Sequence, residues 1–341
     1  MRLAVSCGRD PDFLDDVAAY AARGLPVTRV AMRRGIAPVA DAVSLCRLIL
    51  CVRRMRPDLI HAHSSKAGFL ARLAGRVCGV PVIYTPHALP FLMACGSRKL
   101  RFYRFLEKRM RDATAALIAV SEEERQAALA LGYGERRVYF IPNGVARCDS
   151  RPVTIRANGV LRVGFFGRLT RQKGPDVLLE AVADVVAHMP QVHFSFYGAG
   201  PMADDLRKQA EERQLASHVH FHGAYRQDEA AARMRQVDVV AVPSRWEGCP
   251  YVVLEAFAAG VPVVAAAVGG VPDLIRDGVN GVCVAANDPE ALCDGLLDVL
   301  RDPQKRRQLA EQGLVTAETR SIAAMAAAVE KVYRQVSTAR R

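Results

Sequence analysis

Two glutamates, Glu247 and Glu255, lie on either side of a Gly-Cys-Pro turn, with seven residues between them. The apolar run at residues 237–242 predicts a buried strand before the turn, and Pro250 suits the first turn of a helix after it. We therefore expect Glu247 in the loop at the carboxyl end of the strand and Glu255 inside the helix. The first amides of a helix are free donors at the positive end of its dipole, which favours a phosphate. The segment predicts a phosphate site flanked by carboxylates that can accept sugar hydroxyls.

The residues at the predicted start of this helix are candidates for binding the same ligand. They are Gly248, Cys249, Pro250 and Tyr251. Cys249 is better explained as a small residue that fills space. Either glutamate alone is more typical of an exposed or half-buried helix position, so the prediction depends on partners elsewhere in the chain.

A basic loop at residues 167–174 supplies such partners. An apolar strand pattern ends at Gly167, and a helix is expected from about Pro175. Arg168 and Lys173 lie between them, and the planar fork of Arg with the mobile point charge of Lys suits a diphosphate. Taken alone, this composition is more typical of a solvated surface loop.

A third loop, residues 198–201, follows the next strand pattern with the sequence Gly-Ala-Gly-Pro. Gly198, like Gly167, has no side chain where backbone approaches a ligand. No third glycine follows at the spacing of a dinucleotide-binding fingerprint, so this is not a complete signature of that site.

Together these loops resemble the motifs of the retaining family-four glycosyltransferases, which have the GT-B fold. One such motif is a weak signal, whereas the whole series in the same order is highly specific. The motifs lie at residues 167–174, 198–201, 221–223, 247–255, 259–264, 269–273 and 277–281. Further matches at residues 61–68, 85–87 and 141–144 extend the resemblance over nearly the whole chain.

The resemblance implies an α/β protein with two doubly wound Rossmann-like domains that face a central cleft. Strand patterns alternate with helical patterns through both halves, which independently favours two parallel sheets. We expect an acceptor-side domain at residues 1–146, a linker at 147–160 and a nucleotide-sugar donor domain at 161–320. In this fold the helix at residues 321–341 would cross back to the first domain, although a peripheral helix has the same pattern.

The resemblance also implies roles on the donor side. Glu255 would hold the ribose hydroxyls, and Arg168 and Lys173 would neutralise the leaving diphosphate. Glu247 would orient the donor sugar; the sequence leaves open whether it is the nucleophile of a double displacement or supports a front-face reaction. No Asp-x-Asp motif occurs in a suitable loop, so we expect no required metal and no cofactor.

The first half is implied to bind the sugar and the acceptor. His87 follows a predicted strand and resembles the cleft histidine of the family, although a lone histidine there is as often structural. Ser64, Ser65 and Lys66 are expected to begin the helix after the third strand and to line the acceptor side.

Two departures from the family pattern affect this half. Ala88 stands where the family has glycine after Thr-Pro-His, which would narrow the approach of backbone at that loop. Residues 1–6 resemble the second strand of the family rather than the first, so we expect one βα unit, roughly 30 residues, to be lacking. Either the start codon is placed late or the domain is shortened. The lacking loop normally lies beneath the donor and acceptor phosphates, so we expect its absence to affect activity more than fold.

Composition limits the class of protein. With 341 residues and 51% hydrophobic content, the chain can bury two cores of ordinary size. No apolar run reaches the roughly 18–20 residues of a membrane span, and the N-terminal segment is too short for a signal sequence. The odd number of cysteines and the lack of a Cys-x-x-Cys pair favour thiols in a reducing cytoplasm over disulfides or a zinc site.

The positive charge is concentrated in the first half. Residues 1–150 hold 24 Lys and Arg against 13 Asp and Glu, whereas the remainder is nearly balanced. A predicted helix at residues 97–111 sets basic residues beside leucines and phenylalanines, which suits an anionic membrane surface at the inner face of the cytoplasmic membrane. An ordinary amphipathic helix with solvated charges is an equally good interpretation. The basic residues are Arg98, Lys99, Arg101, Arg104, Lys108 and Arg111, the last four spaced to share one helical face.

The predicted function is transfer of a sugar from a nucleotide diphosphate, with UDP the expected nucleotide, to a glycan or lipid-linked acceptor in polysaccharide or glycolipid synthesis. No nucleic-acid-binding motif is present, so we expect no nucleic-acid partner. Two alternatives stay open. A nucleotide-sugar 2-epimerase has the same two-sheet architecture but needs no acceptor, and a non-catalytic nucleotide-sugar-binding protein would bind without turnover.

Overall fold

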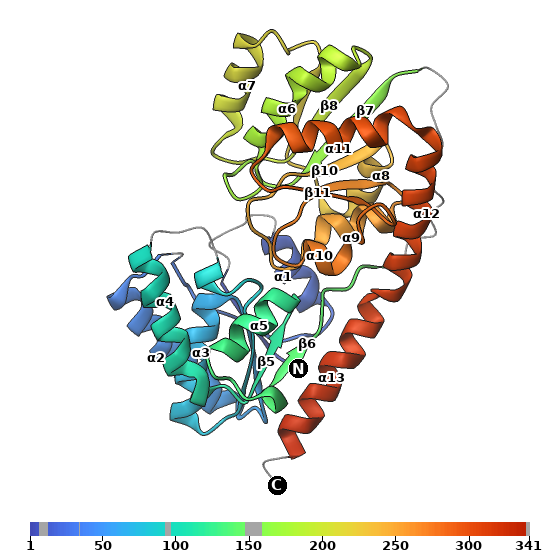
Figure 1. Ribbon diagram of the computed structural model, residues 1–341. Coiled ribbons are helices and arrows are strands. Elements are labelled where there is room, and N and C mark those ends of the chain that lie inside the picture. Colours follow the sequence, from blue (N-terminus) through green and yellow to red (C-terminus); the bar gives the residue numbers. More distant parts are fainter. Residues whose placement is uncertain (7–12, 34, 93–96, 147–158, 339–341) are drawn as a thin grey trace.

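The computed structural model describes residues 1–6, 13–33, 35–92, 97–146 and 159–338 (Figure 1). Two α/β domains lie one above the other in Figure 1, and a long C-terminal helix runs from the upper domain alongside the lower one. The two-domain α/β architecture predicted from the sequence is therefore confirmed. The expected linker falls almost wholly outside the described residues.

The C-terminal domain is built on one parallel sheet with the strand order β12-β11-β10-β7-β8-β9. Its strands are β7 (Leu161–Phe166), β8 (Val192–Tyr197), β9 (Val219–Gly223), β10 (Val239–Val242), β11 (Val263–Ala266) and β12 (Val282–Val284). Every residue of β10 and β11 is buried, as expected for parallel strands covered by helices on both faces. The chain order reverses between β7 and β10, so the loops after these two strands meet at the point where α/β sheets bind ligands.

Helices cover both faces of this sheet. One face packs against α6, α7 and α11, and the other against α8, α9 and α10. Asp288 and Asp302 cap α11 and α12 by accepting from amides of the first turn, and a proline follows each cap. The helices are α6 (Pro175–His188), α7 (Ala203–Glu212), η4 (Gln227–Glu229), α8 (Ala230–Met234), α9 (Tyr251–Ala258), α10 (Val271–Leu274), α11 (Pro289–Arg301), α12 (Pro303–Thr319) and α13 (Ile322–Thr338).

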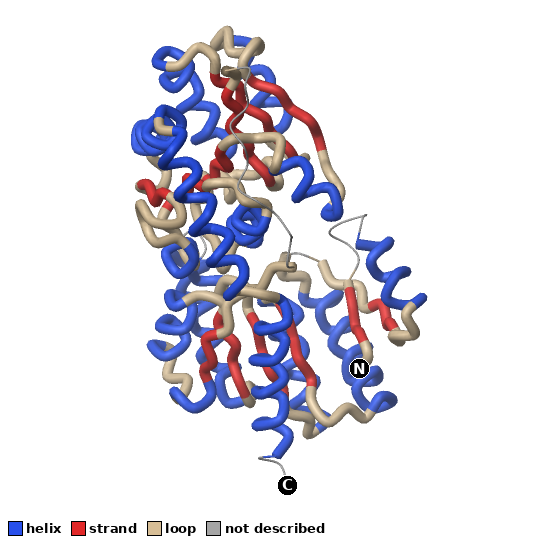
Figure 2. Tube along the Cα trace, turned by 90° about the vertical axis from the view of Figure 1, so that its right-hand side faces the viewer, coloured by secondary structure: helices blue, strands red, loops and turns tan. Residues whose placement is uncertain are grey.

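The N-terminal domain has a four-stranded parallel sheet and a separate parallel pair of strands (Figure 2). The pair is β1 (Leu3–Val5) and β2 (Val27–Arg29), and the larger sheet is β3 (Ile60–His63), β4 (Val82–Thr85), β5 (Ala116–Ala119) and β6 (Val138–Phe140). Among the described residues β1 and β2 pair only with each other. The lack of one βα unit stays a prediction. The helices are α1 (Phe13–Ala22), α2 (Pro38–Met55), α3 (Ser65–Cys78), η1 (Pro90–Leu92), α4 (Ser97–Met110), η2 (Arg111–Ala113), α5 (Glu122–Ala130) and η3 (Glu135–Arg137).

The C-terminal helix α13 packs on the sheet of the N-terminal domain. Val332 is 2% exposed and belongs to one apolar cluster with Ile118 of β5. Next to it, the hydroxyl of Tyr333 lies 2.6 Å from Nδ1 of His61 on β3. The last helix of the chain thus contributes to the core of the first domain and ties the two domains together.

Candidate active site

Loops after β7, β8 and β10 meet at the carboxyl edge of the C-terminal sheet. Gly198 has φ of 146°, and a Cβ added there would lie 1.8 Å from the carbonyl oxygen of Gly167. Gly174 has φ of 65°, and a Cβ there would lie 2.1 Å from the carbonyl oxygen of Pro243. Glycine at these positions lets the three loops contact one another directly.

Glu247 lies in the loop after β10, and its side chain is only 6% exposed. Lys173 places Nζ 2.6 Å from Oε1 of this carboxylate, and the hydroxyl of Ser244 donates to the same oxygen at 2.7 Å. Among the described residues, none donates to Oε2. The structure therefore fixes the carboxylate by one oxygen and leaves the other to accept from a ligand.

Arg168 is placed differently from Lys173. Its side chain is exposed, and its guanidinium contacts Oε1 of Gln172 at 3.5 Å. Gln172 in turn donates to the carbonyl of Trp246 at 3.2 Å, which links the loops after β7 and β10. Arg168 can present its donors to an anion from solvent, whereas Lys173 pairs with Glu247 through one N–H and keeps its other donors for an anion.

Glu255 lies in α9 and is partly buried. The side-chain amide of Gln227 donates to its Oε1, and burial raises the pKa of Glu255. Burial, with a contribution from this carboxylate, also raises the pKa of the Tyr225 hydroxyl to about 12. The loop after β9 therefore lines this part of the site. The motif at residues 221–223 lies directly before this loop, but the sequence assigned no role to Tyr225 or Gln227.

The residues at the start of α9 differ in their surroundings. Tyr251 is 47% exposed, whereas Cys249 is buried, and burial raises the pKa of its thiol to about 11. A thiol protonated at neutral pH is not a nucleophile, which agrees with a space-filling role for Cys249. Pro250 is the N-cap of α9, and the side chain of Asn143 from the N-terminal domain donates to the carbonyl of Cys249 at 2.8 Å.

Gly248 lies where the two domains touch. A Cβ added there would lie 3.0 Å from the carbonyl carbon and oxygen of His87. His87 has φ of 56° and Ala88 φ of 102°, a region that residues other than glycine rarely adopt. The alanine that departs from the family pattern thus lies in strained backbone at the contact between the domains.

Three histidines form a continuous group on the N-terminal side of this contact. His63 Nδ1 lies 2.9 Å from Nε2 of His87, and the ring of His61 lies 4.2 Å from the ring of His63. The His87 side chain is open to solvent, yet the surrounding protein desolvates it and lowers its pKa to about 4. His87 is therefore neutral near pH 7 and suited to hydrogen bonding.

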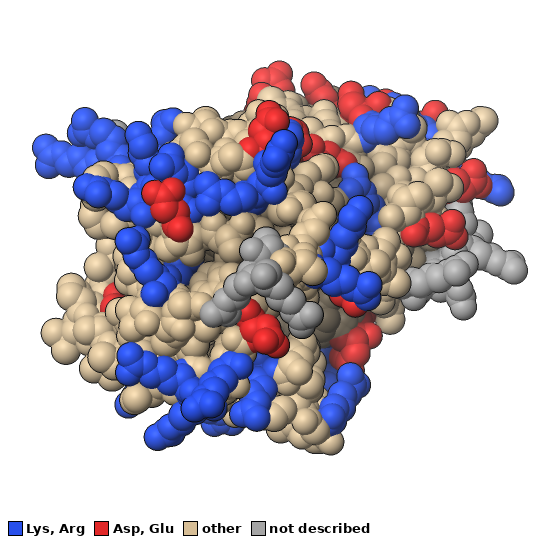
Figure 3. Space-filling view, turned by 90° about the horizontal axis from the view of Figure 1, so that it is seen from below, with Lys and Arg blue, Asp and Glu red and all other residues tan. Residues whose placement is uncertain are grey.

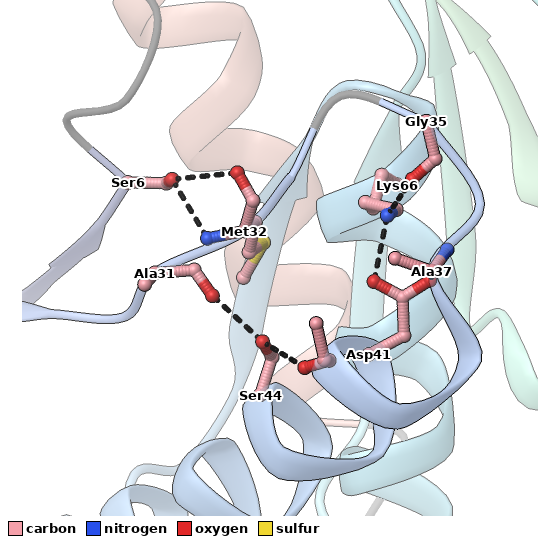
Figure 4. A network of polar contacts seen from close by, with 9 residues as sticks. Ser6, Ala31, Met32, Gly35, Ala37, Asp41, Ser44 and Lys66 are labelled. Carbon is pink, nitrogen blue, oxygen red and sulfur yellow. Dashed lines mark hydrogen bonds and ion pairs between the residues drawn. The ribbon is translucent and has the colours of Figure 1, made fainter.

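The predicted acceptor-side residues lie at the start of α3, close to the neighbouring strand end that carries His87. Ser64 has φ of 68°, and its amide donates to the carbonyl of Thr85 at 3.0 Å. Ser65 is the first residue of α3. Lys66 lies 2.6 Å from Oδ1 of Asp41 and donates to a backbone carbonyl before α2 (Figure 4). Lys66 thus joins α3 to the start of α2 through a partly exposed ion pair.

A pocket of about 230 Å³ opens between the domains beside Glu247. Trp246, the only tryptophan of the chain, lines it together with Glu123 at the start of α5. The remaining lining residues are Ala88, Leu92, Arg245, Glu247, Ala267, Val268 and Gly269. Both domains therefore contribute to the cavity next to the fixed carboxylate.

Two contacts across the domains involve residues to which the sequence assigned no role. Besides the bond from Asn143 described above, the amide of Glu122 donates to Oδ2 of Asp273 at 2.7 Å. Asn143 and Asp273 belong to motifs at residues 141–144 and 269–273, so a signal was present, but only the fold shows what they contact.

Helix α4 places basic and aromatic side chains together on the surface. Phe102 and Phe105 are 46% and 53% exposed, and the guanidinium of Arg109 lies 5.3 Å from the ring centre of Phe105. Figure 3 shows many Lys and Arg side chains on this domain, especially on the side where Figure 1 places α2 and α4. The α4 patch consists of Arg98, Lys99, Arg101, Phe102, Arg104, Phe105, Lys108 and Arg109, all of them exposed.

The expectation that Arg111 shares this face is wrong, because α4 ends at Met110. Arg111 lies in η2 and contacts Asp112 at 3.1 Å and the carbonyl of Gly132 at 3.4 Å. In the described part of the chain, no helix is long and apolar enough to cross a membrane, and no group of His, Cys, Asp and Glu is arranged to hold a metal ion.

Family models match both halves of the chain. The model described as glycosyl transferases group 1 matches residues 149–335, and the model described as a glycosyl transferase 4-like domain matches residues 2–144. A D-inositol 3-phosphate glycosyltransferase of Frankia alni is 34% identical over 300 residues, which are 81% of this chain and 74% of that protein. The UDP-Gal:alpha-D-GlcNAc-diphosphoundecaprenol alpha-1,3-galactosyltransferase of Escherichia coli is 28% identical over 284 residues, 79% and 73% of the two chains.

Solved structures show the same fold. The Anabaena protein HepE, in complex with UDP-glucose, aligns with a TM-score of 0.78 at 20% identity and covers 98% of each chain. A sucrose-phosphate synthase from Thermosynechococcus elongatus also has a TM-score of 0.78, with 21% identity and 99% of each chain covered. These likenesses confirm the predicted GT-B arrangement of two Rossmann-like domains.

Proposed function

We propose a donor and a reaction for this chain, which belongs to the family of glycosyl transferases group 1 and is a glycosyltransferase. It transfers a sugar from a nucleotide diphosphate, with UDP the expected nucleotide, and retains the configuration at the anomeric carbon. The observation that carries the proposal is the meeting of Arg168, Lys173 and Glu247 at the strand ends, with Glu255 in the helix that follows. A titration with UDP that shows no binding would contradict it.

The donor would lie across the switch point between β7 and β10. Glu255, held by Gln227, accepts the ribose hydroxyls, and Arg168 with Lys173 balances the charge that develops on the departing diphosphate. Two cations at this position do the work that a divalent ion does in other transferases, so we propose that no metal or cofactor is required. Loss of activity in EDTA that returns with a divalent ion would refute this part.

Glu247 orients the donor sugar through Oε2. Its other oxygen is held by Lys173 and Ser244, so the carboxylate is fixed beside the pocket. His87 approaches from the opposite domain and, being neutral, donates or accepts one hydrogen bond to the sugar. A front-face reaction needs only such fixed groups around the anomeric carbon. A glycosyl-enzyme intermediate trapped on Glu247 would instead establish a double displacement.

The acceptor enters from the N-terminal domain, by way of Ser64, Ser65 and the pocket lined by Trp246. We propose a glycan or lipid-linked glycan acceptor in polysaccharide or glycolipid synthesis, because the relative from Escherichia coli is named for a diphosphoundecaprenol-linked acceptor. The α4 patch supports this, since its exposed phenylalanines among Arg and Lys suit an anionic lipid surface. The protein would then work at the inner face of the cytoplasmic membrane.

Product analysis tests the reaction. The protein is incubated with UDP-sugars, with and without a lipid-linked glycan, and the products are separated and examined by NMR for anomeric configuration. Transfer that needs the acceptor and retains configuration is the expected result. Conversion of the donor sugar without acceptor would indicate a 2-epimerase, and tight binding with neither outcome would indicate a binding protein.

A further inference from the structure

A fully buried carboxylate lies behind the contact between the domains. Glu124, in the first turn of α5, is 0% exposed. Its Oε1 accepts from the amide of Ala88 at 2.9 Å, and its Oε2 accepts from the amide of Val120 at 2.9 Å. A carboxylate is buried at high cost unless such bonds satisfy it, so its position here needs an explanation.

Capping of α5 is only part of that explanation. Ser121 and Glu124 have the spacing of a capping box, and the amide of Glu124 donates to Oγ of Ser121 at 3.1 Å. In a capping box the glutamate would turn back to the amide of the serine. Here one oxygen turns back to the amide of Val120, one residue before the serine, and the other extends to the loop after β4. The second bond joins two segments that are far apart in the sequence.

The loop that Glu124 holds is strained. His87 and Ala88 have φ of 56° and 102°, and neither is glycine. Such conformations persist only where surrounding contacts impose them, and they cluster at functional sites. On its other side the loop contacts Gly248 and bonds His63 through His87.

We propose that Glu124 is a positioning residue of the active site: by accepting from the amide of Ala88, it holds His87 against Gly248. This inference rests on the proposed role of His87 in binding the donor sugar. Glu124 does not touch the substrate. It acts through the backbone of residues 87–89, which has no other side-chain acceptor among the described residues.

The arrangement also predicts a pH dependence. Burial raises the pKa of Glu124 to about 7, although the amides that it accepts from oppose this. The charged and polar groups that face it are Glu107 of α4, which is paired with Arg72 of α3, and Tyr84 of β4. A protonated carboxyl keeps fewer acceptor sites than a carboxylate, so the hold on the loop weakens as pH falls through about 7.

The test compares Glu124→Gln with Glu122→Gln, which makes the same change on a partly exposed side chain of the same turn. The carboxylate accepts with both oxygens, whereas glutamine has one acceptor oxygen and one NH2 group. The NH2 group cannot accept from a backbone N–H, so one hydrogen bond is lost. We expect kcat to fall about 10- to 100-fold in Glu124→Gln with little change in UDP affinity, the equivalent of one lost bond to a charged group. In the wild type we expect kcat to rise between pH 6 and 8, and in Glu124→Gln this rise should disappear. Glu122→Gln should resemble the wild type in both respects.

Glycine at position 88 provides a rescue, because it adopts positive φ without strain. The double variant Ala88→Gly with Glu124→Gln should recover about tenfold of the lost kcat, which a merely structural role of Glu124 does not predict. If Glu124→Gln does not fold, Glu124→Asp replaces it, with both acceptors kept but a shorter reach. A folded variant at position 124 with wild-type kcat and wild-type pH profile would overturn the proposal.

Amide hydrogen exchange separates this inference from the proposed function. The amide of Ala88 should exchange at least about tenfold faster in Glu124→Gln than in the wild type, whatever the reaction. If exchange is faster in the variant but the wild type transfers no sugar, the inference that Glu124 holds the loop stands. Only the proposed function is then refuted. Unchanged exchange in the variant would show that Glu124 does not hold the loop.

Discussion

Replacement of Lys173 by methionine should destabilise the protein and reduce turnover. The change keeps the length and the apolar stem of the side chain but removes the cation that lies 2.6 Å from Glu247. The two side chains are only 20% and 6% exposed, so the carboxylate would stay buried without its counter-charge. Removal of one partner from such a pair costs about 3–5 kcal/mol. Because Ser244 still donates to the same oxygen, we expect the lower end, about 3 kcal/mol.

Urea unfolding measures this cost, with Arg207→Met as the control. Arg207 pairs with Asp204 on the surface, where the side chains are 47% and 99% exposed, and such pairs contribute about 0–1 kcal/mol. The double variant Lys173→Met with Glu247→Gln should regain most of the stability, since no buried charge is left. Turnover should fall about 100-fold in Lys173→Met, because a group that stabilises the leaving diphosphate is lost. Equal stability of Lys173→Met and Arg207→Met would refute the reasoning.

Three further predictions concern the donor, the membrane and pH. Glu255→Ala should weaken UDP binding by about 1–3 kcal/mol for each ribose hydroxyl left unpaired, as measured by calorimetry or by Trp246 fluorescence, and unchanged affinity would remove Glu255 from the site. Binding to anionic vesicles should weaken with added salt and when three basic residues of the α4 patch are replaced by glutamine. The same replacement of three basic residues in α7 and at its C-terminal end should leave binding unchanged. Equal sedimentation of the two triple variants with the vesicles would contradict a role of the α4 patch. The α4 set is Arg101, Arg104 and Lys108, and the control set is Arg207, Lys208 and Arg213. Burial lowers the pKa of His61 to about 3, so between pH 6.5 and 3 this side chain takes up a proton only when the protein unfolds. The free energy of unfolding should therefore decrease as pH falls through this window, and it should decrease less in His61→Gln.

The sequence by itself determined the fold class and the loops of the donor site. Strand patterns such as residues 239–242 are apolar throughout because parallel strands are covered on both faces, so they can be recognised without a structure. Loops at the carboxyl ends of parallel strands converge by topology, so the closeness of Arg168, Lys173 and Glu247 could be predicted from their place after strands. The strand predicted at residues 237–242 lies at Val239–Val242 in the structure.

Only the tertiary structure decided which contacts these residues make. The ion pair of Lys173 with Glu247, the bond of Gln227 to Glu255 and the hold of Glu124 on Ala88 join residues 28–74 positions apart. Local patterns of apolar and polar residues carry no information about such pairs, because they depend on how separate elements pack. The same is true of the α4 patch. Helical spacing predicted that its Arg and Phe residues lie on one helix, but the buried ion pair of Glu107 with Arg72 determines which face of that helix is exposed to solvent. Patterning thus determines elements and their order, whereas packing between distant elements determines the chemistry of each side chain.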